Sequence, residues 1–497
     1  MDSSPRTNYP QVLNDMQVDV AVVGAGIAGI STAWELVRAG RSVAVFEADR
    51  IVAGTTGYTT AKLTAQHSLV YDRLRSSFDA ETARLYAQSQ VDAIDRVART
   101  VAELGIDCDL ERAPAYTYTL SPDDVAQIHA EVDAARAAGL PASFATETGL
   151  PFPVAGAIRV DDQAQFHPRR YLLALAEDLS RNGGQIFEHT RIVDLEETAP
   201  CRLTTENGAT LSAQHVVIAT QFPVFDRAKL FTRLVPRREF VVAAAIPAER
   251  DPSGMYLTKQ DNTRSVRTAP YHAGKRLLIV TGEGFRPGAS DVAQHVQRLA
   301  DWTRQHFQID ALAYRWAAQD YSTTDGLPYI GRFHSGAERV WVATGFGSWG
   351  MTNGVMAGRL LTALINGHRP EWAGIYDPGR LHPTVESSSL LKASLNVARR
   401  FIGDRLRPKP DSGMAANLSP GTGEVIRVSG ESTAIYRDDA GKLQAVSATC
   451  THLGCTVAFN DVERSWDCPC HGSRFSTDGA ILHGPAVRPL EHRDPPA

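Results

Sequence analysis

The chain of 497 residues has no apolar run as long as the roughly 18 residues that a membrane-spanning helix needs. The mostly apolar stretch from Val18 to Ile30 is shorter and is broken by glycines. The N-terminus, MDSSPRTNYPQVLNDMQ, has neither the basic start nor the apolar core of a secretory signal. We therefore expect a cytoplasmic protein without a transmembrane segment.

The sequence also lacks an excess of positive charge and is poor in cysteine. Its 51 basic and 56 acidic residues give a formal net charge of −5, so the electrostatic footprint of a nucleic-acid-binding protein is missing. Of the six cysteines, Cys108 and Cys201 stand alone and are expected to be buried thiols. The other four fall between positions 450 and 470, and this clustering indicates a site.

A glycine-rich loop near the N-terminus is typical of dinucleotide binding. An apolar strand, Val18–Val23, leads into G-x-G-x-x-G at Gly24, Gly26 and Gly29, and a helical pattern and a second strand follow, ending at Glu47. The glycines permit a tight turn, the approach of a pyrophosphate and close packing of helix on strand. The helix N-terminus attracts phosphate, and the acid can accept hydrogen bonds from ribose hydroxyls. The motif alone does not separate FAD from NAD.

Three later stretches distinguish an FAD-binding protein from an NAD-binding one: QHVVIAT at 214–220, DYSTTDGLPYIG at 320–331 and VWVATGFGSWGMTNGVMAG at 340–358. With ADRIVAGTTGYTTAKLTAQH after the acid, this series resembles the D-amino-acid oxidase/glycine oxidase family of FAD-dependent amine oxidoreductases. The single G-x-G-x-x-G gives no sign of a separate NAD(P)H domain. The resemblance implies FAD contacts at Gly24, Gly26, Gly29, Glu47, Thr55, Thr56, Gly345, Phe346, Gly347, Gly350, Met351 and Thr352.

The resemblance also implies the architecture, which is α/β plus β. A Rossmann-type FAD-binding domain is expected from segments at about 16–95, 155–223 and 320–370. An antiparallel-sheet substrate domain is expected from about 96–154 and 224–319, which together make residues 1–370 one oxidoreductase unit. A linker at 371–417 contains an amphipathic helical pattern at 388–407, which could bind a membrane surface and more readily packs on its own protein.

The match departs from the family at positions that bear on the substrate. Asp320 stands where amino-acid-oxidising members carry an arginine for the substrate carboxylate, so we expect an amine without a clamped carboxylate, or else a structural aspartate. Tyr58 stands where some relatives attach FAD covalently through histidine, which argues against that attachment. Lys62 and Arg267 are further catalytic candidates, although lone charged residues are more often surface residues. The same expectation applies to His67 and Arg264.

The last 80 residues, 418–497, read as short strands that carry the cysteine cluster. A zinc site of the Cys₂His₂ type is one interpretation, but a one-residue spacing between Cys450 and His452 is unusual for zinc. The pairs C-x-H and C-x-x-H, in CTHLGC and CPCHGS, resemble Rieske [2Fe–2S] proteins. That resemblance implies iron ligands Cys450, His452, Cys468 and His471 and a disulfide between Cys455 and Cys470.

The Rieske resemblance extends to the tuning of the cluster. Ser473 can donate a hydrogen bond to a sulfide and raise the reduction potential. High-potential relatives have a tyrosine two positions later, where this sequence has Phe475, so we expect a lower potential.

Together these features predict an FAD-dependent oxidoreductase that oxidises an amine or amino-acid-like substrate. Its flavin would pass electrons singly to the [2Fe–2S] cluster and on to an external acceptor, such as a quinone, a cytochrome or a ferredoxin-like protein. Two alternatives remain open: an external donor could reduce the cluster and then the flavin, or the chain could be a plain oxidase with a structural or partner-binding Rieske domain.

Overall fold

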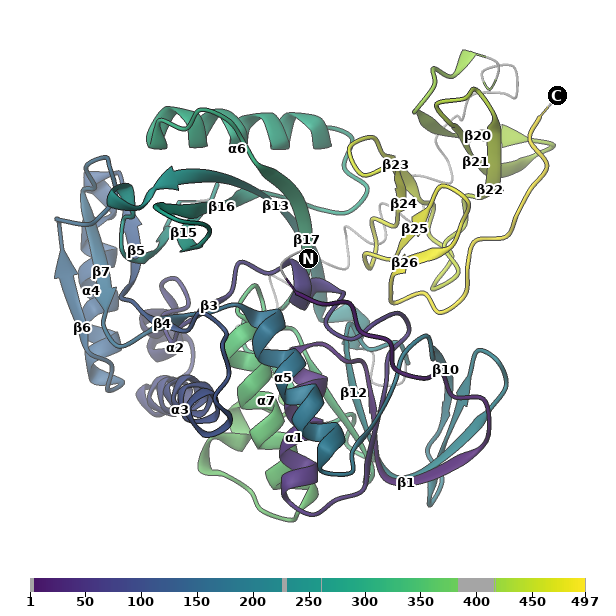
Figure 1. The fold of residues 1–497 in the computed structure, drawn as a ribbon, viewed down its shortest axis with the longest axis horizontal. Coiled ribbons are helices and arrows are strands. Elements are labelled where there is room, and N and C mark those ends of the chain that lie inside the picture. The colour runs from purple at the N-terminus through teal and green to yellow at the C-terminus, as the bar shows by residue number, and fades with distance from the viewer. Residues whose placement is uncertain (1–3, 226–229, 261, 383–414, 416, 497) are drawn as a thin grey trace.

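The computed structural model describes residues 4–225, 230–260, 262–382, 415 and 417–496. Two large sheets stacked one above the other form the main body, and residues 417–496, which we call the C-terminal unit, lie beside the upper sheet (Figure 1). The helix expected within 388–407 falls outside the described residues.

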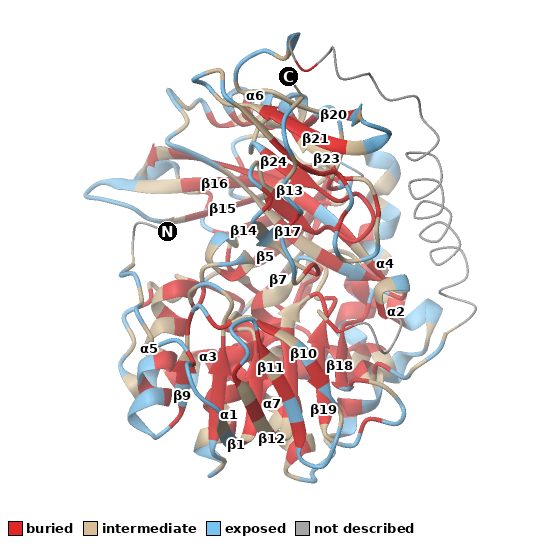
Figure 2. Ribbon diagram, turned by 90° about the vertical axis from the view of Figure 1, so that its right-hand side faces the viewer, coloured by how far each residue is buried: buried red, intermediate tan, exposed pale blue. Residues whose placement is uncertain are grey.

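The lower sheet is built around the strand that precedes the glycine-rich loop. β1 (Met16–Val23) pairs in parallel with β2 (Val43–Phe46) on one side and with β12 (Thr210–Gln221) on the other. β2, the end of β1 and the middle of β12 are buried on both faces, which explains their continuous apolar runs (Figure 2). The remaining strands are β9 (Gln185–Phe187), β10 (Ile192–Glu196), β11 (Cys201–Thr205), β18 (Tyr329–Arg332) and β19 (Val340–Thr344).

Three helices cover one face of this sheet. α1 (Ile27–Arg38) follows the glycine-rich loop and packs between α5 (Pro168–Arg181) and α7 (Gly350–Ile365). Gly354 and Gly358 of α7 bring its backbone against α1, because a Cβ at either position would lie within 3.0 Å of α1 atoms. α2 (Val70–Ser77) and α3 (Ala80–Leu104) extend the same apolar core.

The upper sheet is antiparallel except for one parallel pair, β5 with β14. Its outer face packs on α6 (Val292–Phe307) through an apolar core, and α4 (Val125–Ala137) covers its far edge. In order across the sheet, the strands are β17 (Tyr314–Thr323), β13 (Leu234–Pro247), β16 (Lys275–Phe285), β15 (Arg264–Pro270), β14 (Met255–Thr258), β5 (Ala115–Thr119), β7 (Gly156–Val160) and β6 (Ala142–Ala145). A short sheet of β3 (Lys62–Leu63), β8 (Ala164–Gln165) and β4 (Glu111–Arg112) lies between the two large ones.

Two strands belong to a different sheet from the one expected from the sequence. β7 was expected within the FAD-binding segment 155–223, but it pairs with β5 and β6 in the upper sheet. β17 continues to Thr323 in that sheet, although 320 was expected to open a FAD-binding segment. Both strands belong to the upper sheet, which the sequence did not show because apolar patterning identifies a strand without identifying its neighbours.

The C-terminal unit contains two small antiparallel sheets. One has β20 (Gly423–Val428), β21 (Glu431–Arg437) and β22 (Leu443–Ser447), and the other has β23 (Ala458–Asn460), β24 (Ser465–Asp467), β25 (Arg474–Ser476) and β26 (Ile481–His483). Four cysteines are buried together with Trp466 and Phe475 in the core between them. The expected fold class is therefore confirmed, including the small all-β unit.

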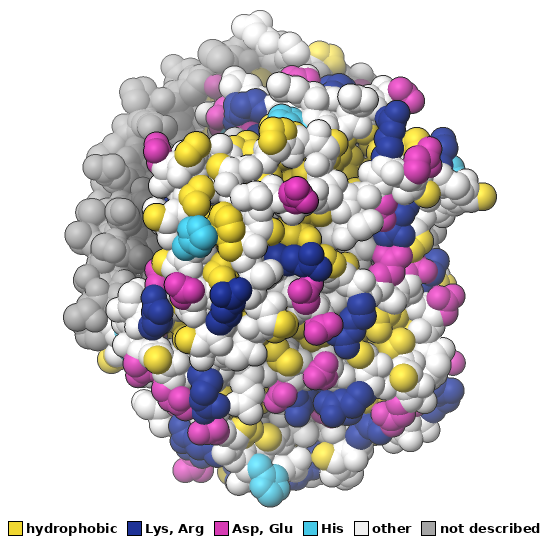
Figure 3. Space-filling model, turned by 90° about the vertical axis from the view of Figure 1, so that its left-hand side faces the viewer, with side chains coloured by type: hydrophobic (Ala, Val, Ile, Leu, Met, Phe, Trp, Pro, Cys, Tyr) yellow, Lys and Arg dark blue, Asp and Glu magenta, His cyan; other side chains and the backbone are white. Residues whose placement is uncertain are grey.

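The distribution of charged and apolar residues agrees with the composition. On the face shown in Figure 3, basic and acidic side chains are interspersed over the described residues. Among the helices of the described residues, none is both long and apolar enough to cross a bilayer.

Candidate active site and iron–sulfur centre

The glycine-rich loop has the geometry that its sequence predicts. Gly24 has a φ of 101°, and a Cβ there would lie 2.6 Å from the carbonyl oxygen of Ala219. A Cβ on Gly29 would lie 1.8 Å from the carbonyl oxygen of Gly24, so only glycine lets α1 approach the loop this closely. The loop thus leaves an open cradle at the N-terminus of α1, which fits a pyrophosphate group.

Side chains from two other segments complete the cradle. Glu47 accepts hydrogen bonds from the backbone N–H groups of Ala25 (2.9 Å) and Asp49 (3.1 Å), and burial raises the pKa of its carboxyl group. The hydroxyl of Thr56 accepts a hydrogen bond from the N–H of Ile27 at 3.1 Å.

A cavity of about 440 Å³ runs from this cradle to the loop before α7. Nine of the residues expected to contact FAD line it: Gly24, Gly26, Glu47, Thr55, Thr56, Gly345, Phe346, Gly350 and Met351. Three do not. Gly29 lies beneath Gly24, Gly347 lines a second cavity of about 330 Å³, and Thr352 is buried with its hydroxyl 3.2 Å from the carbonyl oxygen of Thr64.

Asp320 also lines the large cavity, and its carboxylate is already engaged by the backbone. It accepts hydrogen bonds from the N–H groups of Tyr321 (2.8 Å) and Ser348, which ties β17 to the loop before α7. Burial raises its pKa to about 6. Sequence reasoning missed its neighbour Gln221, which has a φ of 68° and donates to the carbonyl oxygen of Gln319 at 2.6 Å.

The other catalytic candidates lie apart from this cavity. Lys62 donates to the carbonyl oxygen of Tyr256 (3.1 Å) and to Ser265, and burial together with the nearby Arg267 lowers its pKa to about 7. Burial lowers the pKa of Arg267 to about 10. The structure therefore brings Lys62 and Arg267 near each other, but neither lines the cavity.

His67 and Arg264 both have structural partners. His67 is buried between Tyr86 (2.5 Å) and Thr352 (3.1 Å), and burial lowers its pKa to about 3. Arg264 forms an ion pair with Glu283 on the face of the sheet that carries α6.

The four predicted iron ligands converge at the tip of the C-terminal unit. Cys450 and Cys468 are buried free thiols that hydrogen-bond each other, which lowers the pKa of Cys450. The rings of His452 and His471 have centroids 5.0 Å apart. Both Nδ1 atoms are buried without a hydrogen-bond partner, so two thiols and two imidazole nitrogens are available to bind a [2Fe–2S] cluster.

The second cysteines of the two motifs are bonded to each other. Cys455 and Cys470 form a disulfide that links the two ligand loops. The Sγ atoms of Cys455, Cys468 and Cys470 lie within 4.8 Å of one another, but the disulfide removes two of these three from metal binding.

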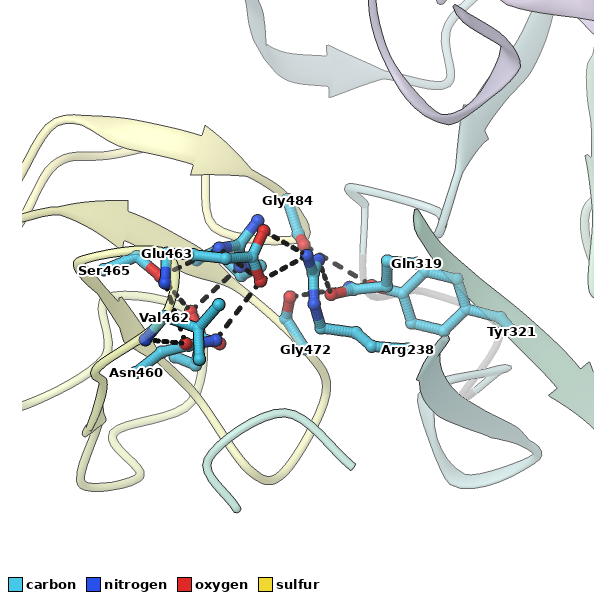
Figure 4. A network of polar contacts seen from close by, with 11 residues as sticks. Arg238, Gln319, Tyr321, Asn460, Val462, Glu463, Ser465, Gly472 and Gly484 are labelled. Atoms are coloured by element: carbon cyan, nitrogen blue, oxygen red, sulfur yellow. Dashed lines mark hydrogen bonds and ion pairs between the residues drawn. The ribbon is translucent and has the colours of Figure 1, made fainter. Parts of the chain in front are cut away.

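Three side chains of the upper sheet contact the C-terminal unit, two of them at its tip (Figure 4). The Tyr321 hydroxyl donates to the carbonyl oxygen of His471 at 3.2 Å, and Gln319 donates to that of Gly472 at 2.8 Å. Arg238 donates to both carboxylate oxygens of Glu463, at 2.6 and 2.7 Å. No local motif marked these residues, since their partners lie 150 or more positions away.

The histidine edge of the tip faces the main body as well. Phe222, which follows β12, packs against both imidazoles, with ring centroids 6.0 Å from His452 and 6.2 Å from His471. Phe231 packs against His471 at 5.6 Å.

Known proteins share both parts of this arrangement. The model of the FAD dependent oxidoreductase family matches residues 19–364, more than half of the chain. The chain belongs to the FAD-dependent oxidoreductase family. The model of the Rieske [2Fe-2S] domain matches residues 411–493 of this oxidoreductase. Both resemblances seen in the sequence are confirmed, and the cofactors of the chain are FAD and a [2Fe–2S] cluster.

One relative shares the fusion of the two parts. The putative Rieske 2Fe-2S iron-sulfur protein YhfW of Bacillus subtilis (strain 168) is 34% identical over 494 residues, which cover 99% of this chain and 96% of that protein. Gamma-glutamylputrescine oxidoreductase of Escherichia coli (strain K12) is 24% identical over 366 residues, covering 70% of this chain and 84% of that protein. Glycine oxidase from Geobacillus kaustophilus has the same fold, with a TM-score of 0.61 at 21% identity, covering 73% of this chain and 99% of that one.

Proposed function

We propose that this oxidoreductase oxidises an amine or amino-acid-like substrate and passes the electrons, one at a time, through its own cluster to an external acceptor. The observation that carries the proposal is the contact between the cluster tip and the flavin cavity. Asp320 lines the cavity, and the next residue, Tyr321, donates its hydroxyl hydrogen bond to the backbone of the iron ligand His471.

The residues of this chain have distinct parts in that scheme. When bound, FAD accepts two electrons from a C–H bond beside nitrogen, whereas the cluster carries one electron. The cradle at Gly24 and Gly26 would hold the pyrophosphate, and Cys450, Cys468, His452 and His471 would hold the cluster. Asp320 fixes the loop before α7 through Ser348.

The substrate class rests on charge in the cavity wall. Asp320 and Glu239 both line the cavity, Glu239 is paired with Arg237 at 3.1 Å, and the family's arginine is absent from position 320. Carboxylates favour a cationic amine over a second carboxylate. Two of the similar proteins are named for nitrogen compounds, gamma-glutamylputrescine and glycine.

Anaerobic stopped-flow mixing with a panel of amines and amino acids tests the proposal. Flavin bleaching followed by the electron paramagnetic resonance (EPR) signal of the reduced cluster is the expected order. An external donor that reduces the cluster before the flavin, in the absence of amine, would indicate the reverse flow.

A cluster-ligand variant distinguishes the plain oxidase. In His452→Ala, flavin bleaching by the amine should persist while the cluster signal is lost. Undiminished peroxide production by this variant in air would support the oxidase instead. His492→Ala is the matched control, because His492 is an exposed histidine of the same unit.

A further inference from the structure

The wall of the flavin cavity is built from both parts of the chain. Besides the glycine-rich loop and the loop before α7, it includes a segment at the end of the C-terminal unit. The residues of that segment in the wall are Ile481, Leu482, His483, Gly484, Ala486 and Val487. They lie more than 450 positions from Gly24, so the folded arrangement alone brings them to the cavity.

This segment is held against the main body by specific contacts. The carbonyl oxygen of Gly484 lies 3.5 Å from the Tyr321 hydroxyl, and Gly484 also lies beside Val224. The neighbouring loop is fixed by the hydrogen bond from Gln319 to Gly472 and by the ion pair of Arg238 with Glu463. The cavity wall therefore depends on the docked position of the C-terminal unit.

His483 is the polar side chain of this segment. Its ring stacks on that of Tyr321, with centroids 6.3 Å apart and an angle of 13° between the planes. Burial lowers the pKa of His483 to about 3, and Arg238, Arg474 and Asp467 are the charged groups that act on it. The ring is therefore neutral at physiological pH and offers one hydrogen-bond donor and one acceptor.

We propose that the FAD site spans both parts of the chain, with His483 as the polar contact that the C-terminal unit makes with the dinucleotide. The cluster-bearing unit then has a second role, which is to close the cofactor site. This role requires neither a particular substrate nor a direction of electron flow.

Hydrogen exchange on the unaltered chain tests the shared site. The protein is freed of flavin while it keeps its cluster, and exchange is then compared with and without added FAD. FAD should slow exchange in peptides that cover 24–29 and also in those that cover 481–487. The exposed turn at 438–442 serves as the internal control and should not change.

A substitution then tests the contact itself. His483→Ala should weaken FAD binding about tenfold, the loss expected for one good hydrogen bond, when FAD fluorescence is titrated against flavin-free protein. His492→Ala should bind FAD like the unaltered chain, and the EPR signal should show that both variants retain the cluster. Unprotected 481–487, or an unchanged dissociation constant in His483→Ala, would overturn the proposal. Neither readout involves substrate, so such a failure leaves the proposed electron flow untouched.

Discussion

Replacing Arg238 with methionine should loosen the contact between the C-terminal unit and the main body. The side chain of Arg238 is 3% exposed and makes two charged hydrogen bonds to Glu463. Truncating one partner of a buried charged pair costs about 2–5 kcal/mol. We expect the lower end, because Glu463 keeps an ion pair with Arg474 at 3.2 Å. A loss of about 2 kcal/mol shifts the docked equilibrium roughly 30-fold.

The assay is the interval between flavin bleaching and the EPR signal of the reduced cluster under argon. Arg238→Met should lengthen that interval and speed hydrogen exchange in the loop at 468–473, while flavin reduction by substrate stays fast. The exposed Arg427 of β20 provides the matched control, Arg427→Met. Adding Glu463→Gln to Arg238→Met should restore part of the loss, because the carboxylate that has lost its Arg238 partner is then replaced by a neutral amide. An unchanged interval and unchanged exchange in Arg238→Met would refute the reasoning.

Three further substitutions have defined outcomes. Tyr321→Phe removes one hydrogen bond to His471, about 0.5–1.5 kcal/mol, and should slow cluster reduction but not flavin reduction in stopped-flow traces; equal rates would contradict this. Phe475→Tyr should raise the midpoint potential in an EPR-monitored redox titration, because the added hydroxyl can donate toward the cluster, and an unmoved midpoint would exclude that donor. Asp320→Asn should abolish an inflection near pH 6 in flavin reduction by amines. Because folding raises the pKa of Asp320, its protonated form stabilises the folded chain at low pH. In urea titrations this contribution to the free energy of unfolding should decrease as the pH rises from 3.8 to about 6 in the unaltered chain, and it should be missing in the variant.

The cofactor motifs were predictable because each is local. The turn at Gly24 and the close packing at Gly29 depend on neighbours within a few residues, so the spacing alone indicated a dinucleotide cradle. The motifs CTHLGC and CPCHGS are also local, and their resemblance to Rieske proteins implied both the ligand set and the disulfide partners.

The joining of the two units was not predictable in this way. Arg238 and Glu463 are 225 positions apart, and neither stands in a motif. Arg237, the neighbour of Arg238 on β13, lines the flavin cavity, whereas Arg238 pairs with Glu463 of the C-terminal unit. Successive side chains of a strand point to opposite faces, so two adjacent arginines have different partners. Asp320 was recognised as a departure from its family, but its bond to Ser348 appears only in the fold.

Gly472 limits how freely the two units could be exchanged with those of other proteins. It has a φ of 81°, and a Cβ there would lie 2.6 Å from Nε2 of Gln319 and 3.0 Å from the Tyr321 hydroxyl. Glycine is therefore required here both by the backbone conformation of its own loop and by the close approach of β17. A chimaera that carries a foreign Rieske domain would therefore need a compatible surface at β17 as well as a suitable linker.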